Sequence, residues 1–495
     1  DAASTAIYGA QGANGVILIT TKSAKGGKTV VSYNGYIQGK SIRNTLDVMD
    51  PYQFVMYNYE RQALRGASSI KNFEERYGAY GDLDLYQYQK GHNWQEEMFG
   101  NNELSQSHNI SVTGGSEKTK FTLSGTYAND KSLMEDNGYR RYNMNFKLKH
   151  ELYKNLNLDF GVRLADTETQ GVGTGGGTYK IRSYDALMKA PVYGLYDQID
   201  IDPSTLPEDE YQEYVNATRS LKDQVNDYWR RKNERRYNFN AAITWDITKS
   251  FSYRAEGGYD YTFNQQKDWY GPKSSKAVQD GGELPMGEWS KKDSWKLRGA
   301  HTLAWKQNFA KIHDVNIMIG QEYVASNSES NNMIGKFFQE DISPEKMFAS
   351  MANNSKATGA QTISSTLGKE DRTISFFGRA NYSLYDRYLL TVTMRADGSS
   401  KFSRGNRWGY FPAAALAWRI IEEPFMENTK EWMSNLKLRF SYGTAGNNRI
   451  GDAMYETTYK AYSGGKYYGQ GGEQNPHYTL NNNQLANSNL KWETT

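Results

Sequence analysis

Residues 156–164 read LNLDFGVRL, and this stretch decides the fold class. Leucine, phenylalanine and valine occupy the even positions, while asparagine, aspartate, glycine and arginine occupy the odd positions. Successive side chains of a β-strand point to opposite faces, so this pattern gives one apolar and one polar face. The stretch therefore predicts a strand that lies between an apolar environment and a wet one.

The same alternation recurs along the chain, for example over 142–149, 251–263 and 436–443. It predicts thirteen strands, at 28–39, 105–115, 118–128, 139–151, 154–166, 230–247, 249–264, 291–308, 312–326, 371–384, 387–397, 407–421 and 434–444. Two folds fit such strands. One is a soluble sandwich with one face in its core, and the other is a membrane barrel with one face toward lipid.

The connections between these strands favour the barrel. Tight turns such as 115–117, 310–311 and 385–386 alternate with long gaps, and only 422–433 departs from this order. The long gaps lie at about 40–104, 167–229, 265–290, 327–370 and 445–489. An up-and-down barrel has short turns at one rim and long loops at the other, which a Greek-key sandwich does not need. The prediction is an all-β, transmembrane antiparallel up-and-down barrel.

Composition narrows the class further. No stretch approaches the roughly 20 apolar residues of a membrane helix, and mean hydropathy is −0.81. The chain has no Cys, which excludes disulfides and thiolate metal sites. A net charge of +3 gives no electrostatic reason to expect a nucleic-acid partner. Tyr and Trp gather at strand ends, as in the aromatic girdles of barrels, at Tyr139, Tyr142, Trp229, Trp245, Trp305, Tyr385, Tyr388, Trp408, Tyr410 and Trp418.

The first residues do not follow the barrel pattern. Residues 1–22 read DAASTAIYGAQGANGVILITTK, in which Gly9, Gly12 and Gly15 permit tight turns before a buried strand at Val16–Ile19. With Tyr8, this motif resembles the C-terminal end of the plug domain of TonB-dependent outer-membrane transporters of the SusC/RagA family. The family usually has Arg where Gln11 stands. Later stretches are similar in family order, at 108–115, 395–402, 408–412, 436–443, 446–447 and 490–493.

The resemblance implies a 22-stranded barrel closed by an N-terminal plug. Residues 1–27 would be the end of the plug and a linker, and 28–495 the N-terminal and central part of the barrel, with long gaps facing outside. The TonB box would lie upstream of Asp1 and the last strands beyond Thr495. The resemblance also implies import of a large nutrient, with a SusD-like lipoprotein lid, the TonB–ExbB–ExbD complex and outer-membrane lipid as partners. We expect an oligosaccharide as solute, with a peptide as the alternative.

Aromatic residues in the outward gaps are candidate solute contacts, because sugar rings stack on aromatic faces. They are Trp94, Tyr228, Trp269, Tyr270, Trp289, Tyr467 and Tyr468. The competing interpretation is that these side chains pack the loops together or contact the lid. Polar strand positions would line the lumen, namely Lys147, Arg163, Arg254 and Arg439.

Other motifs give no catalytic or cofactor site. Asp197, Asp200 and Asp202 form a calcium candidate, which we rank below a solvated loop. The GVGTGG run at 171–176 matches a dinucleotide pattern, but its strand belongs to a meander and not to a βαβ unit. We interpret Asp397 as a turn residue, and nothing sets Glu422 and Glu423 as a glycosidase pair. The prediction is a protein that is not an enzyme and needs no cofactor.

Two other classes stay open at this point. A soluble β-rich protein that binds or degrades glycans would use the same alternation within its own core. A passive porin would fit the strands but not the start of the chain at residues 1–22.

Overall fold

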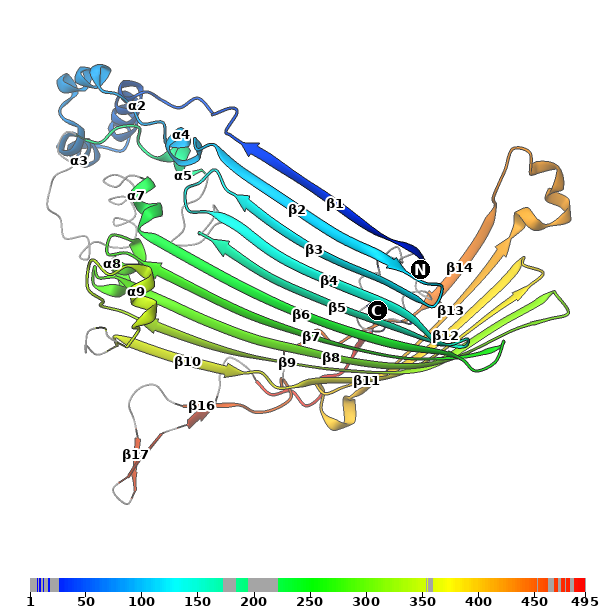
Figure 1. Ribbon diagram of the computed structural model, residues 1–495. Coiled ribbons are helices and arrows are strands. Elements are labelled where there is room, and N and C mark those ends of the chain that lie inside the picture. The colour runs from blue at the N-terminus through cyan, green and yellow to red at the C-terminus, as the bar shows by residue number, and fades with distance from the viewer. Residues whose placement is uncertain are drawn as a thin grey trace.

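One curved antiparallel sheet dominates the structure (Figure 1). The computed structural model describes residues 7, 9, 12, 17, 26–171, 184–194, 221–352, 354, 359–451, 453–461, 467–470, 473–476, 478–480 and 485–494. The sheet has fourteen strands, and neighbours in sequence are neighbours in space. Its strands are β1 (Gly27–Lys40), β2 (Glu103–Gly115), β3 (Thr119–Lys131), β4 (Gly138–Tyr153), β5 (Leu156–Gln170), β6 (Tyr228–Asp246), β7 (Phe251–Tyr270), β8 (Met286–Phe309), β9 (His313–Gly335), β10 (Gln361–Leu367), β11 (Asp371–Leu384), β12 (Tyr388–Ser399), β13 (Trp408–Arg419) and β14 (Lys437–Gly443).

The fourteen strands make thirteen passes along the sheet. β10 pairs with Glu329–Gly335 of β9, and β11 pairs with His313–Ser326 of the same strand. Residues 368–370 stand opposite 327–328 at the break, so an irregularity of one extra residue divides a single pass. The thirteen predicted strands are confirmed as passes, and so is the up-and-down order.

The tight turns also lie where the sequence predicts them. Ala310 and Lys311 join β8 to β9, and Tyr385 and Asp386 join β11 to β12. All four residues have positive φ between 52° and 63°. Each pair occupies the two central positions of a β-turn, closed by Ile312 N–H to Phe309 O or by Arg387 N–H to Leu384 O, and Ile312 and Arg387 complete the three-residue connections. Two consecutive left-handed residues at these positions match the twist of the flanking strands. These turns hold the register of the sheet at one rim.

The opposite rim carries the helices and is the outer rim in the orientation that the resemblance implies (Figure 1). Its helices and 3₁₀ segments are α2 (Pro51–Ala63), α3 (Ala67–Tyr77), η2 (Tyr80–Tyr88), α4 (Trp94–Phe99), α5 (Asp185–Met188), α7 (Leu221–Asn226), α8 (Ser275–Gly281) and α9 (Pro344–Ala349). Asp50 caps α2 and Pro51 is its first residue, because a fixed φ and a missing N–H suit that position. The first rim loop, residues 41–102, packs Val55, Phe73 and Tyr86 into one core together with Val192 from a later loop.

Smaller elements complete the described chain. η4 (Arg404–Asn406), η5 (Ile420–Glu422) and η6 (Pro424–Thr429) lie in connections, and the last two fill the long turn at 422–433. Beyond β14 come short strands in three pairs: β15 (Gly446–Asn447) with β20 (Glu493–Thr494), β16 (Tyr459–Ala461) with β19 (Tyr478–Leu480), and β17 (Tyr467–Gln470) with β18 (Glu473–Pro476).

Two of the expected long gaps are shorter than predicted. β7 continues to Tyr270 and β8 begins at Met286, so the gap expected at 265–290 shrinks to 271–285 and contains α8. The range 327–370 contains the end of β9, α9 and β10. These strand ends project beyond the apolar zone, where polar surroundings lie on both sides. Because the outward positions there need not be apolar, the alternation on which the prediction relied is absent.

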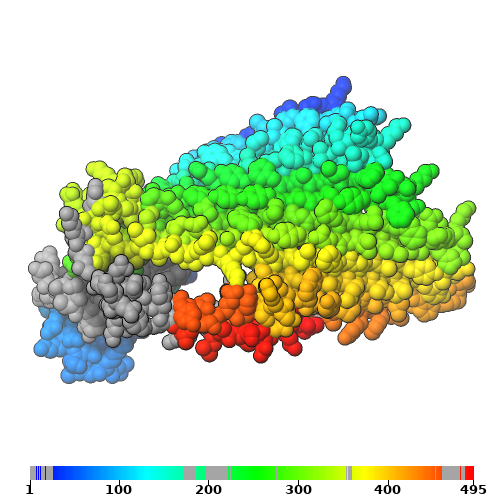
Figure 2. All heavy atoms as spheres, turned by 90° about the horizontal axis from the view of Figure 1, so that it is seen from below, coloured from blue at the N-terminus to red at the C-terminus, as the bar shows by residue number. Residues whose placement is uncertain are grey.

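The sheet separates an apolar outer face from a polar inner face. The register aligns Phe146, Val162, Phe239, Tyr259 and Leu297 across five strands on the outer face. By the same alternation Lys147, Arg163, Arg254 and Arg439 lie on the inner face, as predicted. Figure 2 views the molecule from below and shows successive strands side by side in colour order.

Closure of the barrel is not seen in this chain. The edge strands β1 and β14 do not pair with each other. The outer face of β14 leaves Leu438, Phe440 and Tyr442 between 62% and 71% exposed. No helix among the described residues is long and apolar enough to cross a membrane.

Candidate functional site

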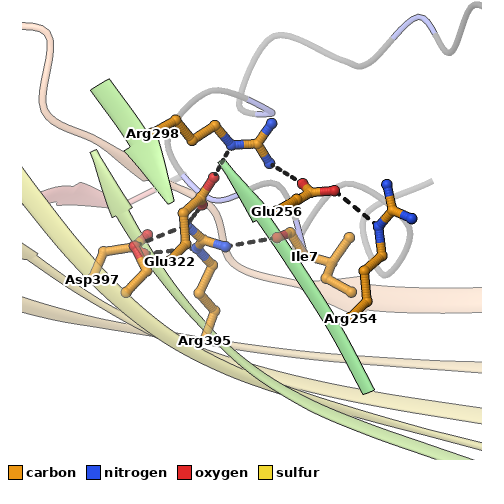
Figure 3. A network of polar contacts seen from close by, with 8 residues as sticks. Ile7, Arg254, Glu256, Arg298, Glu322, Arg395 and Asp397 are labelled. Carbon is orange, nitrogen blue, oxygen red and sulfur yellow. Dashed lines mark hydrogen bonds and ion pairs between the residues drawn. The ribbon is translucent and has the colours of Figure 1, made fainter. Parts of the chain in front are cut away.

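The inner face of the sheet is organised around Arg395 of β12 (Figure 3). Its guanidinium donates to Asp397 Oδ1 at 2.7 Å, to Glu322 Oε2 at 3.0 Å and to Ser375 Oγ at 2.9 Å. A fourth bond, 2.7 Å long, reaches the backbone carbonyl of Ile7. Arg395 is only 4% exposed, so these acceptors replace the water that its charge would otherwise require. The cation therefore joins three strands of the sheet to the N-terminal segment.

The charges continue across the neighbouring strands. Arg298 of β8 donates to Glu322 at 2.8 Å, and its second nitrogen lies 3.4 Å from Glu256 of β7. Arg254 then binds Glu256 at 3.0 Å and lies 3.8 Å from Asp159 of β5. Cations and anions thus alternate in space along the inner wall (Figure 3). This alternation offsets the desolvation of each group with a neighbour of opposite charge.

Gly9 shows how closely the N-terminal segment approaches this network. It is buried and has a φ of +58°, a conformation that glycine adopts without strain. A Cβ at this position would lie 2.8 Å from both Arg395 Cζ and Asp397 Oδ2. The second oxygen of Asp397 has no hydrogen-bond partner among the described residues. Glycine therefore lets the backbone lie directly against the charged pair.

The prediction that Asp397 is a turn residue is wrong. Asp397 lies in β12, is 1% exposed and accepts from Arg395 two positions earlier. The Asp-Gly-Ser-Ser composition favoured a turn, but the β-strand continues to Ser399. The sequence signal that was missed is the alternation of polar and apolar residues. The polar positions are Thr391, Thr393, Arg395 and Asp397, and the apolar positions between them are Leu390, Val392 and Met394. Two charged residues at the inward-facing positions of a strand indicate that the strand continues along the lumen and does not turn there.

A polar pocket of about 340 Å³ opens on the inner side near the break between β10 and β11. Hydroxyl and charged side chains line it, among them Asp260, Thr262, Ser294, Lys296, Ser326 and Ser328. Lys369 at its edge donates to Glu456 of the last rim loop at 2.6 Å. This hydrogen bond lowers the pKa of the Glu456 carboxyl from its ordinary value. The pocket offers donors and acceptors in place of an apolar cavity.

Trp94 belongs to the interior of the rim loops. It is 2% exposed, stacks on His92 with ring centroids 4.6 Å apart, and donates its indole N–H to Ala190 O. It packs with Met134 and Leu221 from other loops. These contacts favour the packing interpretation, and a solute contact by Trp94 stays a prediction.

Tyr228 and Tyr270 lie together on the inner face at the outer ends of β6 and β7. Their rings stack with centroids 4.7 Å apart, and Tyr228 donates to Asp268, which also binds Arg230. The pair packs against Ala277 of α8 and against Met286. Of the seven aromatic candidates, these two lie on the side where a solute would pass, although α8 packs against them.

Trp269 and Trp289 lie on the other face. The register places them with Trp229 on the outer side of β6, β7 and β8, where they pack against Phe348 and Met347 of α9. They are therefore separated by the sheet from Tyr228 and Tyr270. From the sequence, all four residues are assigned to loops, because the predicted strands do not reach them. The strands in fact continue, and so residues next to each other in sequence point to opposite faces.

The remaining candidates fall partly or wholly outside the described residues. Tyr8, Gly15, Asp197, Asp200 and Asp202 are among the residues that the structure does not describe, whereas Gly12 is described and buried. Tyr467 and Tyr468 lie in β17, and their side chains are not described. Within the described ranges no group of three or more His, Asp or Glu side chains could hold a metal ion.

Comparison with protein-family models identifies the family to which this chain belongs. The model of the family described as "TonB dependent receptor-like, beta-barrel" matches residues 193–495, which is more than half of the chain. The chain belongs to the TonB-dependent receptor family. Its members are receptors and not enzymes, which confirms that prediction, and they lie in the bacterial outer membrane.

Individual relatives cover the whole chain. TonB-dependent receptor P3 of Formosa agariphila is 28% identical, and TonB-dependent receptor SusC of Bacteroides thetaiotaomicron is 26% identical, each over 100% of this chain. The chain spans 45% and 47% of their lengths, about half of each. Among solved structures, the RagAB peptide importer aligns over 99% of this chain and 54% of its own, at 20% identity and a TM-score of 0.75. The predicted resemblance to the SusC/RagA type is confirmed.

The charge network gives a direct prediction for the full-length receptor. Replacing Arg395 by alanine leaves the buried Asp397 without its cation and leaves Glu322 with Arg298 alone. Breaking a buried ion pair in this way costs about 3–5 kcal/mol. We expect Arg395→Ala to lower the unfolding temperature in detergent and to make the N-terminal segment easier to cleave with trypsin, because the bond to Ile7 O is also lost.

Arg163→Ala is the matched control. Arg163 lies on the same inner face, is exposed, and makes no ion pair with any residue that the structure describes. Its replacement should change stability by no more than about 0.5 kcal/mol. Equal unfolding temperatures and equal cleavage rates for the two variants would contradict the proposed role of Arg395.

Proposed function

We propose that this receptor imports a large, hydroxyl-rich solute across the outer membrane by energy-coupled transport. The observation that carries the proposal is the two-faced sheet: an apolar outer face suited to lipid and a charged inner wall that holds Ile7 and Gly9. A passive pore would have no need for an N-terminal segment bonded to its wall. The inner contact therefore supports a gated passage.

An oligosaccharide is the solute that we propose first. The inner pocket presents hydroxyl, carboxylate and ammonium groups, which suit the donors and acceptors of sugar hydroxyls. A peptide is the alternative, and its support is the fold shared with RagAB, whose printed description is a peptide importer. The two solutes differ in charge, since only a peptide brings an ammonium and a carboxylate terminus.

The proposal extends to the coupling machinery and to a lid. In it, residues 1–27 form the end of a plug and a linker, 28–495 form part of the barrel, and the TonB–ExbB–ExbD complex drives the plug. A SusD-like lipoprotein covers the outer rim. The first rim loop supports this lid, because Leu64, Leu85 and Tyr88 are 91%, 55% and 87% exposed. Large exposed apolar side chains on a helical loop are suited to a protein partner.

The solute class is testable by growth and uptake. Deletion of the receptor gene should abolish growth on one class of oligosaccharide as sole carbon source, and the full-length gene should restore it. A protonophore should stop uptake of the labelled oligosaccharide, because transport depends on inner-membrane energy. A defect confined to peptides would favour the alternative, and uptake that survives the protonophore would contradict energy coupling.

The lid is testable by co-purification of the full-length receptor with a SusD-like lipoprotein from the same bacterium. We expect the double variant Leu85→Asp, Tyr88→Asp to weaken binding by about tenfold or more, since buried apolar anchors dominate interfaces. Trp432→Asp is the control, because Trp432 is 72% exposed but lies at the opposite rim. Retained binding in the double variant would exclude this loop as the docking site.

A further inference from the structure

The inner wall carries an excess of positive charge above the network around Arg395. Arg298 of β8 is the uppermost cation of that network, and the next inward position toward the helical rim is Lys296. Four successive inward rows begin at this position. On β5 to β9 they hold five cations and two carboxylates, namely Arg163, Lys232, Arg236, Lys292 and Lys296 against Glu234 and Asp260. Cations and anions alternate below these rows, whereas cations prevail within them.

These rows lie at the upper end of the passage. Phe251 pairs with Trp305 near the lower end of the outer face. Asp260 comes nine residues after Phe251, so it lies roughly 21 Å higher at about 3.3 Å per residue and a 45° tilt. An apolar band of about 25 Å therefore ends close to this row. Asn264, which stands opposite Lys292, is roughly 9 Å higher still, so the excess charge faces the mouth of the passage.

Most of these cations have no anionic partner. Arg236 pairs with Glu234 at 2.6 Å, so this carboxylate is already in use. The other four cations form no ion pair with any residue that the structure describes. Lys232 of β6 and Lys292 and Lys296 of β8 lie on either side of β7, so the three ammonium groups share one stretch of the wall.

The nearby carboxylates do not neutralise these lysines. Asp260 stands opposite Lys296 in the register, but its Oδ1 accepts from the side-chain amide of Asn238 in β6, on the other side of β7. Asp371, at the β11 end of the same row, lies 3.6 Å from Lys401. One carboxylate without a cation therefore stands among four cations without an anion.

The next inward row toward the helical rim is balanced again. Arg230 follows Lys232 on that face of β6 and pairs with Asp268 at 2.5 Å, and Lys276 of α8 lies 3.8 Å from Glu288. An opposite charge thus compensates the charged groups both above and below the four rows. A charge that the wall leaves open at one level is suited to a ligand that passes there.

The polar pocket of about 340 Å³ adjoins these charges, and Lys296 lines it. Hydroxyl groups line the pocket beside this lysine, from Thr262, Ser294, Ser326 and Ser328. Lys369 at the pocket edge is bound to Glu456, so Lys296 is the ammonium group that the pocket offers to a ligand. Hydroxyl groups suit the ring hydroxyls of a sugar, and an ammonium group suits an anionic substituent on that ring.

We infer that the imported oligosaccharide is anionic and that its carboxylate or sulfate groups bind Lys232, Lys292 and Lys296. The inference rests on the proposed function, in which an oligosaccharide is the solute, and adds the charge of that solute. The Cα atoms of Lys292 and Lys296 are about 13 Å apart along β8, so these cations suit a chain that carries several anionic groups. An acidic peptide would supply the charge but not the ring hydroxyls that suit the pocket.

Titration of the full-length receptor in detergent with two matched pairs of oligosaccharides tests this inference. The first pair is an oligogalacturonide and its methyl ester, and the second is a carrageenan oligosaccharide and its desulfated form. We expect at least one charged member to bind and its neutral partner to bind roughly tenfold more weakly, because charge-assisted hydrogen bonds to the lysines are lost. Added sodium chloride should weaken binding of the charged member alone.

The double variant Lys292→Gln, Lys296→Gln should weaken binding of the charged member roughly tenfold. Neither lysine has an ion-pair partner among the described residues, so the unfolding temperature should not change. Lys306→Gln, Lys437→Gln is the matched control, because it removes the same charge from inward positions at the rim of tight turns. The control should bind all four oligosaccharides as the wild type does.

Equal binding of the charged and neutral members would overturn the inference, and so would equal affinities in the two double variants. Absence of binding for both charged oligosaccharides would refute it as well, and growth on a neutral oligosaccharide would then leave the proposed import function standing. Failure to import any oligosaccharide would instead count against that function. Binding of a poly-glutamate peptide in place of both charged glycans would assign the lysines to the peptide alternative.

Discussion

A bilayer offers no hydrogen bonds to a polypeptide backbone, and this constraint shapes the molecule. Every strand must pair with neighbours on both sides, and its side chains must divide between lipid and an inner space. The register from β2 to β13 meets the first demand across the sheet. The alternation of outer apolar and inner polar residues over most of the sheet meets the second. The turns, loops and helices lie at the rims, where water again satisfies polar groups.

The same alternation places charged side chains on the inner face, where some of them, such as Arg395 and Asp397, are buried away from water. Their loss of hydration must be offset by contacts within the protein. Arg395, Glu322 and Asp397 satisfy one another and also hold the backbone of Ile7. A mobile N-terminal domain would need attachments of this kind that are specific but limited in number. One guanidinium with four acceptors provides an anchor whose release is a discrete event. The inner wall is therefore part of the proposed gate as well as of the passage.

The sequence was sufficient for the passes, the tight turns and the lumenal parity of Arg163 and Arg254, because period two survives wherever one face meets lipid. It failed above the lipid, where the outward positions of β7 and β8 mix polar residues such as Gln265 and Lys267 with tryptophans, so the regular alternation is lost. For the same reason it grouped Trp269 with Tyr270, although adjacent residues of a strand lie on opposite faces. The partners of Arg395 come from β9, β11 and residue 7, and no local pattern reports such distant contacts.

The central claim is that odd residues of β7 meet lipid and even residues meet the inner space. The chain has no Cys, so single cysteines can be placed at each position from 251 to 261 of the full-length receptor in liposomes. A label at odd positions should be quenched by a bilayer-embedded quencher, whereas even positions should respond to a water-soluble one. A two-residue period in quenching is the predicted result. Equal quenching at odd and even positions would contradict the account.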